Sequence, residues 1–349
     1  MDTNGKLRVA LVGCGNFTHN ALLPSIRLAP MTVVAACDLD AGRAEATAAV
    51  MGGKAYTDYD KMLASEQLDL VMMAIGPNVY PALSNKAFEA GVHVYLQKPP
   101  ALSVAEAEAL KAEAARHDCQ LIVGFMKRFG TGYRMAHDIA HSAEFGPLTH
   151  ISARLRSGPY RPVWSKEATA KAFVLDHSIH FLDLMRFYGG DVASLTAIPS
   201  PTVGDRFGFA VALRYKSGAT GLLEISNYET RGVPNEHVEI LGSNGRSVTV
   251  DNISHVSYAR GAVPMERGRK FDDQTETLVW QPNMTVISQE NGSIAHTGFL
   301  GEMRNLADTL LAGGHVQPDM GEGIAALEIA EALLASDGNS VVLSSGAAA

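Results

Sequence analysis

Short apolar runs alternate with longer amphipathic stretches over residues 7 to 124. The runs are nearly continuous, as expected for parallel strands buried on both faces: LRVALV, TVVAAC, LDLVMMAI, HVYL and QLIVGF. Between them lie alanine-rich segments with helical spacing, AGRAEATAAVM, YPALSNKAFEAG and SVAEAEALKAEAARH. The last segment opens with Ser103 and Glu106, the spacing of a capping box. This alternation predicts a doubly wound parallel sheet of the α/β class.

After about residue 125 the pattern changes to period two. FGFAVALRY-KSG-ATGLLEIS and HVEILG-SNG-RSVTV are apolar alternations around glycine-containing turns, and LTHISARLRS is a further strand. Helical stretches are expected at GYRMAHDIAHS, at roughly 173–188, at GFLGEMRNLADTLLAG and at GEGIAALEIAEALLAS. We therefore expect a dinucleotide-binding domain over 1–125 and, over 126–349, an α+β domain with a large, mostly antiparallel open sheet. The C-terminal helices are able to pack back on the first domain.

Composition narrows the class of protein. Of the 349 residues, 46% are hydrophobic and 19% charged, which is typical of a soluble globular protein. The net charge of -8 argues against nucleic acid or an anionic membrane as partner. No apolar run approaches the roughly 20 residues of a membrane span, and the N-terminal sequence lacks the order of a signal peptide. Cys14, Cys37 and Cys119 match no zinc or disulfide spacing, so we expect free thiols, no metal site and a cytoplasmic location.

The first turn, GCGNFT, lies between a predicted strand and a predicted helix. Gly13 and Gly15 permit a tight turn and a close approach of the backbone to a pyrophosphate, with Asn16 and Phe17 following. Thr18 occupies the third position of G-x-G-x-x-G, so the fingerprint is incomplete. A purely structural turn remains an alternative.

Asp38 ends the second predicted strand, 23 residues after Gly15. An acid at this place binds the adenosine ribose hydroxyls of NAD and repels the 2′-phosphate of NADP. The alternative is that Asp38 only caps the next helix, while Arg43 keeps NADP open as a cofactor.

The sequence Ile75 to Asn78, IGPN, ends the run LDLVMMAI, and Lys98 follows the run HVYL. Both therefore belong at the carboxyl edge of the sheet, where such folds bind ligands. Asn78 either contacts the cofactor or caps a helix. Pro99 excludes Lys98 from the helical region, and the peptide bond between them is open to either isomer.

The segment VLDHSIHFLDLMRF places Asp176 and His180 at i and i+4, on one face of the predicted helix. A histidine, or a lysine of lowered pKa, can exchange the hydroxyl proton during hydride transfer from a carbinol carbon, and a carboxylate can orient it. The alternative is a helix cap and a half-buried histidine without chemistry.

The chain resembles the family of glucose–fructose oxidoreductase, inositol dehydrogenase and MocA-type proteins over nearly its whole length. The resemblance rests on the order of GCGNF, Asp38, Pro77-Asn78, Lys98-Pro99, GFMKRF, Asp176-x-x-x-His180 and Asp183. It implies a Rossmann domain and a sheet domain whose open face forms homodimers or homotetramers. It also implies that Lys98, Asp176 and His180 are the catalytic set for oxidation of a hydroxyl, or the reverse, on a sugar, cyclitol or sugar derivative.

On this interpretation NAD binds before the substrate. His180 accepts the hydroxyl proton, Lys98 polarises the hydroxyl oxygen, and Asp176 orients the substrate or the histidine. The roles of His180 and Lys98 can be exchanged. The expected cofactor-binding residues are Gly13, Gly15, Asn16, Phe17, Asp38, Gly76, Pro77, Asn78, Gln97 and Lys98. The expected substrate-binding residues are Lys98, Arg128, Tyr160, Trp164, Asp176, His177 and His180. Tyr160 and Trp164 lie in the run SGPYRPVW, for which the alternative is an ordinary surface loop with a buried tryptophan.

Three positions depart from the family pattern. Gln97 replaces an acid before the lysine, Tyr80 and Pro81 lie where a histidine follows the Pro-Asn corner, and Thr18 replaces a small residue. Two other functions stay open: a non-catalytic NAD(P)-binding regulatory protein, and an NADP-linked reductase of a keto- or imine-type substrate.

Overall fold

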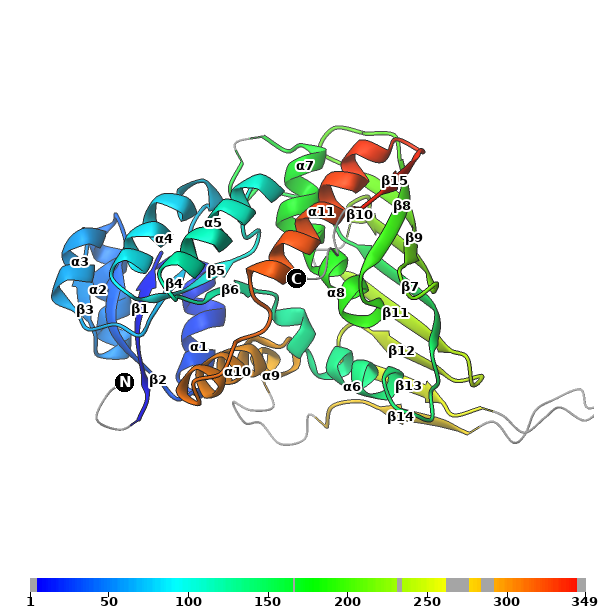
Figure 1. Cartoon of the computed structure of the whole chain (residues 1–349), viewed down its shortest axis with the longest axis horizontal. Helices are drawn as coiled ribbons and strands as arrows, with labels where there is room; N and C mark the ends of the chain where they lie inside the picture. The colour runs from blue at the N-terminus through cyan, green and yellow to red at the C-terminus, as the bar shows by residue number, and fades with distance from the viewer. Residues whose placement is uncertain (1–4, 166, 231–233, 262–275, 284–291, 344–349) are drawn as a thin grey trace, which may run out of the picture. The chain divides into compact units, whose positions relative to one another are not determined.

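The structure is a computed structural model of the whole chain, and it describes residues 5–165, 167–230, 234–261, 276–283 and 292–343 (Figure 1). The chain forms two compact units. The first comprises Met1–Met126 and Gly298–Leu327, and the second comprises Lys127–Thr297 and Glu328–Ala349. The first unit is thus built from two separate stretches of sequence.

A six-stranded parallel sheet forms the centre of the first unit. Its order is β3-β2-β1-β4-β5-β6, the arrangement of a Rossmann fold. The strands are β1 (Leu7–Val12), β2 (Met31–Cys37), β3 (Lys54–Tyr56), β4 (Leu70–Met73), β5 (His93–Gln97) and β6 (Leu121–Gly124). The predicted doubly wound sheet is confirmed, and the edge strand β3, which is short and mostly exposed, is an addition to the prediction.

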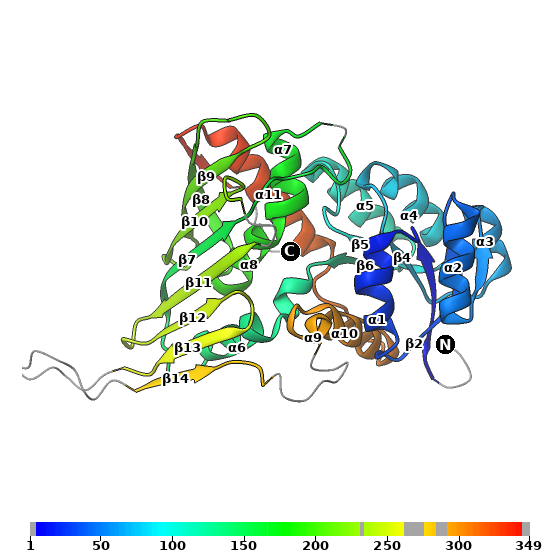
Figure 2. The same cartoon turned by 180° about the vertical axis from the view of Figure 1, so that it is seen from behind.

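Helices cover both faces of this sheet. They are α1 (Leu23–Ile26), which continues a π-helical turn η1 (Thr18–Leu22), α2 (Ala41–Met51), α3 (Tyr59–Ser65), η2 (Pro77–Val79), α4 (Tyr80–Glu89), α5 (Val104–Arg116) and α10 (Phe299–Leu311). In both views α1 and α10 lie side by side on one face, and α4 and α5 lie on the other (Figures 1 and 2). The predicted cap of α5 is confirmed, because Ser103 Oγ accepts a hydrogen bond from the Glu106 amide at 3.3 Å.

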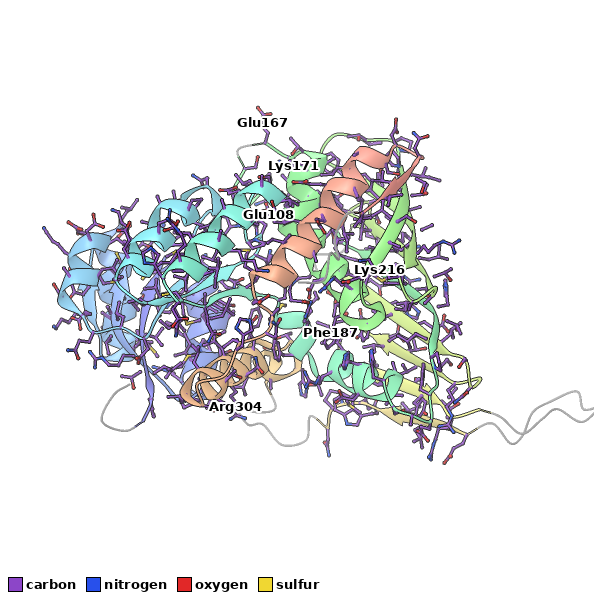
Figure 3. All side chains as sticks on the ribbon, viewed as in Figure 1. Glu108, Glu167, Lys171, Phe187, Lys216 and Arg304 are labelled. Atoms are coloured by element: carbon purple, nitrogen blue, oxygen red, sulfur yellow. The ribbon has the colours of Figure 1, made fainter. Side chains whose placement is uncertain are left out.

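Helix α10 completes the core of the first unit. Its buried Met303, Leu306 and Leu310 belong to one apolar cluster with side chains of β1 and α1, such as Leu7 and Leu23. Its Arg304, labelled in Figure 3, donates from Nε to the Leu28 carbonyl oxygen at 3.1 Å. A segment near residue 300 is therefore part of a fold that begins at residue 7.

A nine-stranded mixed sheet forms the second unit, in the order β14-β13-β12-β11-β7-β10-β9-β8-β15. Only β7 and β10 pair in parallel; the other pairs of the described strands are antiparallel. The strands are β7 (Leu148–Arg156), β8 (Val192–Pro199), β9 (Gly208–Tyr215), β10 (Thr220–Ser226), β11 (Asn235–Gly242), β12 (Ser247–Asp251), β13 (His255–Ala259), β14 (Thr277–Trp280) and β15 (Ser340–Val342). The expected mostly antiparallel sheet is confirmed.

Helices of the second unit lie on one face of this sheet. They include α6 (Thr131–Ala140), after the short η3 (Met126–Phe129), and the succession α7 (Ala170–Phe173), η4 (Val174–Ser178) and α8 (Ile179–Gly189). Both views show α6, α7 and α8 on the same side, and no helix of the described residues covers the other (Figures 1 and 2). The helix expected over roughly 173–188 therefore contains a π-helical turn, η4, at Asp176.

Two helices complete the inventory, α9 (Ser293–His296) and the long α11 (Met320–Ser336). Among the described residues, none of the helices is both long and apolar enough to cross a membrane.

Candidate active site

The glycine turn follows β1 and has a conformation that only glycine adopts readily. Gly13 has φ +89°, and a Cβ at this position would lie 2.5 Å from the carbonyl oxygen of Ala74. Thr18 is buried and donates from Oγ1 to the carbonyl oxygen of Gly13 at 2.5 Å. The departure from the glycine fingerprint thus has a physical role, since the threonine hydroxyl ties the first helical turn back to the glycine turn.

Gly15 differs from Gly13, because a Cβ on Gly15 would meet no atom within 4 Å. It borders a cavity of about 460 Å³ whose lining residues are Cys14, Gly15, Asn16, His19, Asp40, Gly42, Arg43 and Ala46. Asn16 and Phe17 are exposed in the first helical turn, and the ring of Phe17 packs edge-on against Phe299. Open space beside glycine and a helix start is what a pyrophosphate group requires, so the residues present fit a dinucleotide.

Asp38 is half-buried at the carboxyl end of β2. Its carboxylate accepts hydrogen bonds from the backbone N–H of Cys14 at 2.8 Å and of Asp40 at 2.9 Å. Helix α2 is capped by Asp40, which accepts from the Arg43 amide, so the alternative that Asp38 caps this helix is wrong. Asp38 instead joins the end of β2 to the glycine turn.

The corner after β4 contains Gly76, Pro77 and Asn78. The N-caps of η2 and α4 are Gly76 and Val79, and neither helix has a side-chain capping bond. The alternative that Asn78 caps the following helix is therefore wrong, and its side chain is exposed.

Gln97 is the last residue of β5, and Lys98 follows it at the same edge of the sheet. Lys98 is half-buried, and the Lys98–Pro99 peptide is cis. Gln97 is buried: its carbonyl oxygen accepts from the Tyr80 hydroxyl at 3.0 Å, and its Nε2 donates to the Tyr95 hydroxyl at 2.6 Å. Tyr80, one of the departures from the family pattern, thus anchors the residue before the lysine.

In the second unit, Asp176 lies in the π-helical turn η4 with its side chain buried. Its Oδ2 accepts from the Tyr160 hydroxyl at 2.6 Å and from the Val163 amide at 3.1 Å. Burial, and then the Asp176 carboxylate, raise the pKa of Tyr160 well above its usual range, so this hydroxyl keeps the proton it donates. The structure therefore joins the predicted substrate loop to the predicted catalytic aspartate.

His177 and His180 lie on the same helical succession. The His177 ring stacks on Phe173 with centroids 5.6 Å apart, and His180 is buried at the start of α8. Trp164 is 37% exposed, so the alternative interpretation of this segment as a loop with a buried tryptophan is wrong. π-Helical turns are frequent at functional sites, which agrees with the placement of Asp176.

Arg128 forms a bidentate ion pair with Asp183, with Nε 2.8 Å and Nη2 2.6 Å from the two carboxylate oxygens. Both residues are buried, and the guanidinium lies over the ring of Phe187, which is labelled in Figure 3. This pair gives Arg128 a structural partner, and its contact with substrate stays a prediction. Such a buried pair is costly to break from one side.

Sequence reasoning missed three groups at these places: the backbone amide of Val163, the hydroxyl of Tyr95 and the carboxylate of Glu302, to which Tyr95 donates at 2.9 Å. The available signal was Tyr95 itself, a hydroxyl-bearing side chain between the apolar residues Val94 and Leu96 of β5. Within the described ranges, no group of three histidine, cysteine or acidic side chains could hold a metal ion.

The fold and these sites define a class of protein: a nucleotide-dependent oxidoreductase with a Rossmann unit and an α+β unit. Family models agree. Residues 7–125 match the oxidoreductase family, NAD-binding Rossmann fold, and residues 142–343 match the C-terminal alpha/beta domain of the same family. The chain belongs to the Gfo/Idh/MocA oxidoreductase family, and its first unit is an NAD-binding Rossmann domain.

Individual relatives share at most about a third of their residues with this chain in the two alignments below. The chain is 30% identical to a D-apiose dehydrogenase of Paraburkholderia graminis over 69% of this chain and 66% of that protein. It is 26% identical to a myo-inositol 2-dehydrogenase of Thermotoga maritima over 62% of this chain and 67% of that protein. The aligned stretches thus span about two thirds of these relatives.

A crystal structure of a dehydrogenase from Chromobacterium violaceum superposes with a TM-score of 0.84 at 23% identity, covering 95% of both chains. A levoglucosan dehydrogenase in complex with NADH superposes with a TM-score of 0.79 at 17% identity, covering 97% of this chain and 99% of that one. These two likenesses concern the fold.

Proposed function

We propose that this protein is an NAD-dependent dehydrogenase that oxidises a CH–OH group of a sugar, cyclitol or sugar derivative, or catalyses the reverse reaction. The observation that carries the proposal is the buried Asp176, held by Tyr160 and Val163 in a π-helical turn that leads into His180. A buried carboxylate in such a place needs a reason beyond packing. The relatives that bear the names inositol and apiose dehydrogenase supply the substrate class.

The cofactor is held, on this proposal, by the carboxyl edge of the first unit. The turn at Gly13 and Gly15 takes the pyrophosphate, Asp38 takes the adenosine ribose hydroxyls, and Asn78 and Gln97 lie along the same edge. When bound, NAD supplies a hydride acceptor, or a donor in the reverse direction. Asp38 also disfavours NADP, because its carboxylate would face the 2′-phosphate.

Three side chains of the protein manage the proton. His180 takes the hydroxyl proton, because imidazole exchanges protons near neutral pH. The Lys98 ammonium stabilises negative charge on the same oxygen, and Asp176 orients either the imidazole or neighbouring hydroxyls of the substrate. The exchange of roles between His180 and Lys98 is the alternative, and pH profiles of the two variants below distinguish them.

Single substitutions test this catalytic set. Lys98→Ala and His180→Ala should each lower kcat by about 10²–10⁴-fold at saturating NAD, the usual contribution of a proton-transfer group. Fluorescence titration with NADH separates this effect from any change in cofactor affinity. Matched controls are Lys61→Ala, on an exposed face of α3, and His255→Ala, exposed in β13. Near wild-type rates in both Lys98→Ala and His180→Ala would refute the assignment.

The substrate is tested by a panel of sugars, inositols and sugar acids with NAD and NADP, followed through the absorbance of the reduced nicotinamide. Turnover with NAD supports the proposal. Preference for NADPH with a keto- or imine-type substrate, or tight NADH binding without turnover of any compound, would instead favour the two other functions.

We also propose that copies of the chain associate through the uncovered face of the nine-stranded sheet. This face carries Leu222 and Ile198, which are 52% and 60% exposed and line a hollow of about 770 Å³ that extends from β8 to β11. Leu222→Glu should convert a homodimer or homotetramer to monomer in light scattering, whereas Val50→Glu, on exposed α2, should not. A monomeric wild-type protein would contradict this proposal. The three free thiols suit a cytoplasmic location, which is part of the same proposal.

A further inference from the structure

Three buried polar side chains form a hydrogen-bonded network next to Lys98, at the end of β5. Gln97 Nε2 donates to the Tyr95 hydroxyl at 2.6 Å, and that hydroxyl donates to Glu302 Oε2 at 2.9 Å. Tyr95 is fully buried, and Gln97 and Glu302 are 5% and 2% exposed. All three belong to the first unit, two on β5 and one on α10.

The backbone makes room for this chain. Gln97 pairs with Gly124 across β5 and β6, and a Cβ on Gly124 would lie 2.6 Å from the Tyr95 hydroxyl oxygen and 2.8 Å from Gln97 Nε2. Any side chain at Gly124 would displace the amide or the hydroxyl. The Tyr80 hydroxyl holds the other end of Gln97 through its carbonyl oxygen. Gln97 is therefore fixed through both its backbone and its side chain.

The order of donors in the chain follows from the tyrosine. A phenol has one proton. Burial, and then the Glu302 carboxylate, raise the pKa of Tyr95 well above its ordinary value, so the hydroxyl stays protonated. Its one O–H donates the hydrogen bond to Glu302. Only lone pairs remain toward residue 97, so the group at 2.6 Å there must itself donate. An amide donates, and a carboxylate does not.

We propose that Glu302 is a positioning residue for Lys98, acting through Tyr95 and Gln97, and that its buried carboxylate is the reason why position 97 holds an amide and not an acid. The inference rests on the proposed role of Lys98. It also gives a physical account of Gln97: the buried carboxylate of this network lies on α10, and the group at the end of β5 is an amide that donates to Tyr95.

An exchange of the two end groups tests the proposal. In Gln97→Glu, the carboxyl groups of residues 97 and 302 both compete for the single proton of the Tyr95 hydroxyl. Either one of the two carboxyl groups is protonated, or the two carboxylates repel each other. In Gln97→Glu with Glu302→Gln, Tyr95 donates to residue 97 and accepts from the amide at 302, and the chain is complete in reverse. Glu302→Gln alone keeps an acceptor for Tyr95 and removes only the charge.

We expect Gln97→Glu to lower kcat, with less change in KM, by about 10–100-fold, the effect of displacing a catalytic group by a fraction of an ångström to one ångström. The double variant should recover most of this loss. Recovery separates positioning from simple loss of packing, because both substitutions are nearly isosteric. A Gln97→Glu enzyme with unchanged kcat, or a double variant no faster than Gln97→Glu, would overturn the proposal.

A calorimetric measurement tests the chain without any turnover, so its result stands even if the proposed reaction fails. The carboxyl pair in Gln97→Glu has a raised folded pKa, so this variant should lose little stability near about pH 5 and more as pH rises toward about 8. The double variant should not show this dependence. Tyr215→Phe, which removes a hydroxyl that donates to the neutral Met185 carbonyl oxygen, should be destabilised equally at both pH values. Equal melting temperatures for Gln97→Glu and wild type at the higher pH would contradict the donor order.

Discussion

Tyr160→Phe removes one hydroxyl from the surroundings of Asp176 and little else. The Tyr160 ring keeps its edge-on contact with Phe173 at 5.7 Å between centroids, while the 2.6 Å bond to the buried carboxylate is lost. A hydrogen bond to a charged group contributes about 1.5–3 kcal/mol, against about 0.5–1.5 kcal/mol for a neutral pair. We therefore expect the free energy of unfolding to fall by about 2 kcal/mol.

The chain offers both a selective probe and a matched control. Its two tryptophans, Trp164 and Trp280, lie in the second unit, so tryptophan fluorescence during urea unfolding reports on that unit. With a slope of about 2 kcal/mol per molar urea, the midpoint should fall by about 1 M. Tyr215→Phe removes a buried hydroxyl that donates to the neutral Met185 carbonyl at 3.1 Å, and it should cost less. If Tyr160→Phe costs no more than Tyr215→Phe, the Asp176 carboxylate is not held as described.

Three further substitutions test other parts of the structure. Asp38→Ala should weaken NADH binding about tenfold and reduce the preference over NADPH, measured by fluorescence titration, because a charge-assisted site is lost; unchanged affinities would contradict the ribose site. Gly13→Ala should destabilise the first unit by more than about 1 kcal/mol in calorimetry, since φ is +89° and the new Cβ would lie 2.5 Å from Ala74 O; a stable variant would contradict this. Asp319 lies before α11. Burial raises its pKa, but hydrogen bonds from His315 and from two backbone amides outweigh burial and hold that pKa below its ordinary value. Its stabilisation is therefore present above about pH 4 and lost as pH falls through the folded pKa. Asp319→Asn should be less stable at neutral pH and should lose less stability on acidification; parallel pH curves would refute this.

Local patterns determined much of the fold. The run LRVALV coincides with β1, and AGRAEATAAVM coincides with α2, because buried parallel strands and capped alanine-rich helices each have a strong local signal. The strand β3 was missed because only three mostly exposed residues form it. The π-helical turns were missed because apolar spacing does not distinguish hydrogen bonds to i−4 from those to i−5.

The candidate site was accessible from the sequence only where its residues follow strands or share a helix. Lys98 and Asp38 were found from their places after apolar runs. The bond between Tyr95 and Glu302 joins residues 207 positions apart, and the Arg128–Asp183 pair joins residues 55 positions apart. Contacts between residues so far apart in the sequence form only when each unit folds, and local sequence patterns do not predict them.

The discontinuity of the first unit has a consequence for how the chain matures. The wall of its core that α10 supplies is made late, since residues 299–311 follow every described strand of the second sheet except β15. During synthesis the apolar side chains around Leu7 therefore stay without the layer that α10 supplies until nearly nine tenths of the protein has left the ribosome. A nascent chain stalled at residue 125 would present an apolar face to chaperones, and an expression fragment ending there would be a poor substitute for the intact nucleotide-binding unit.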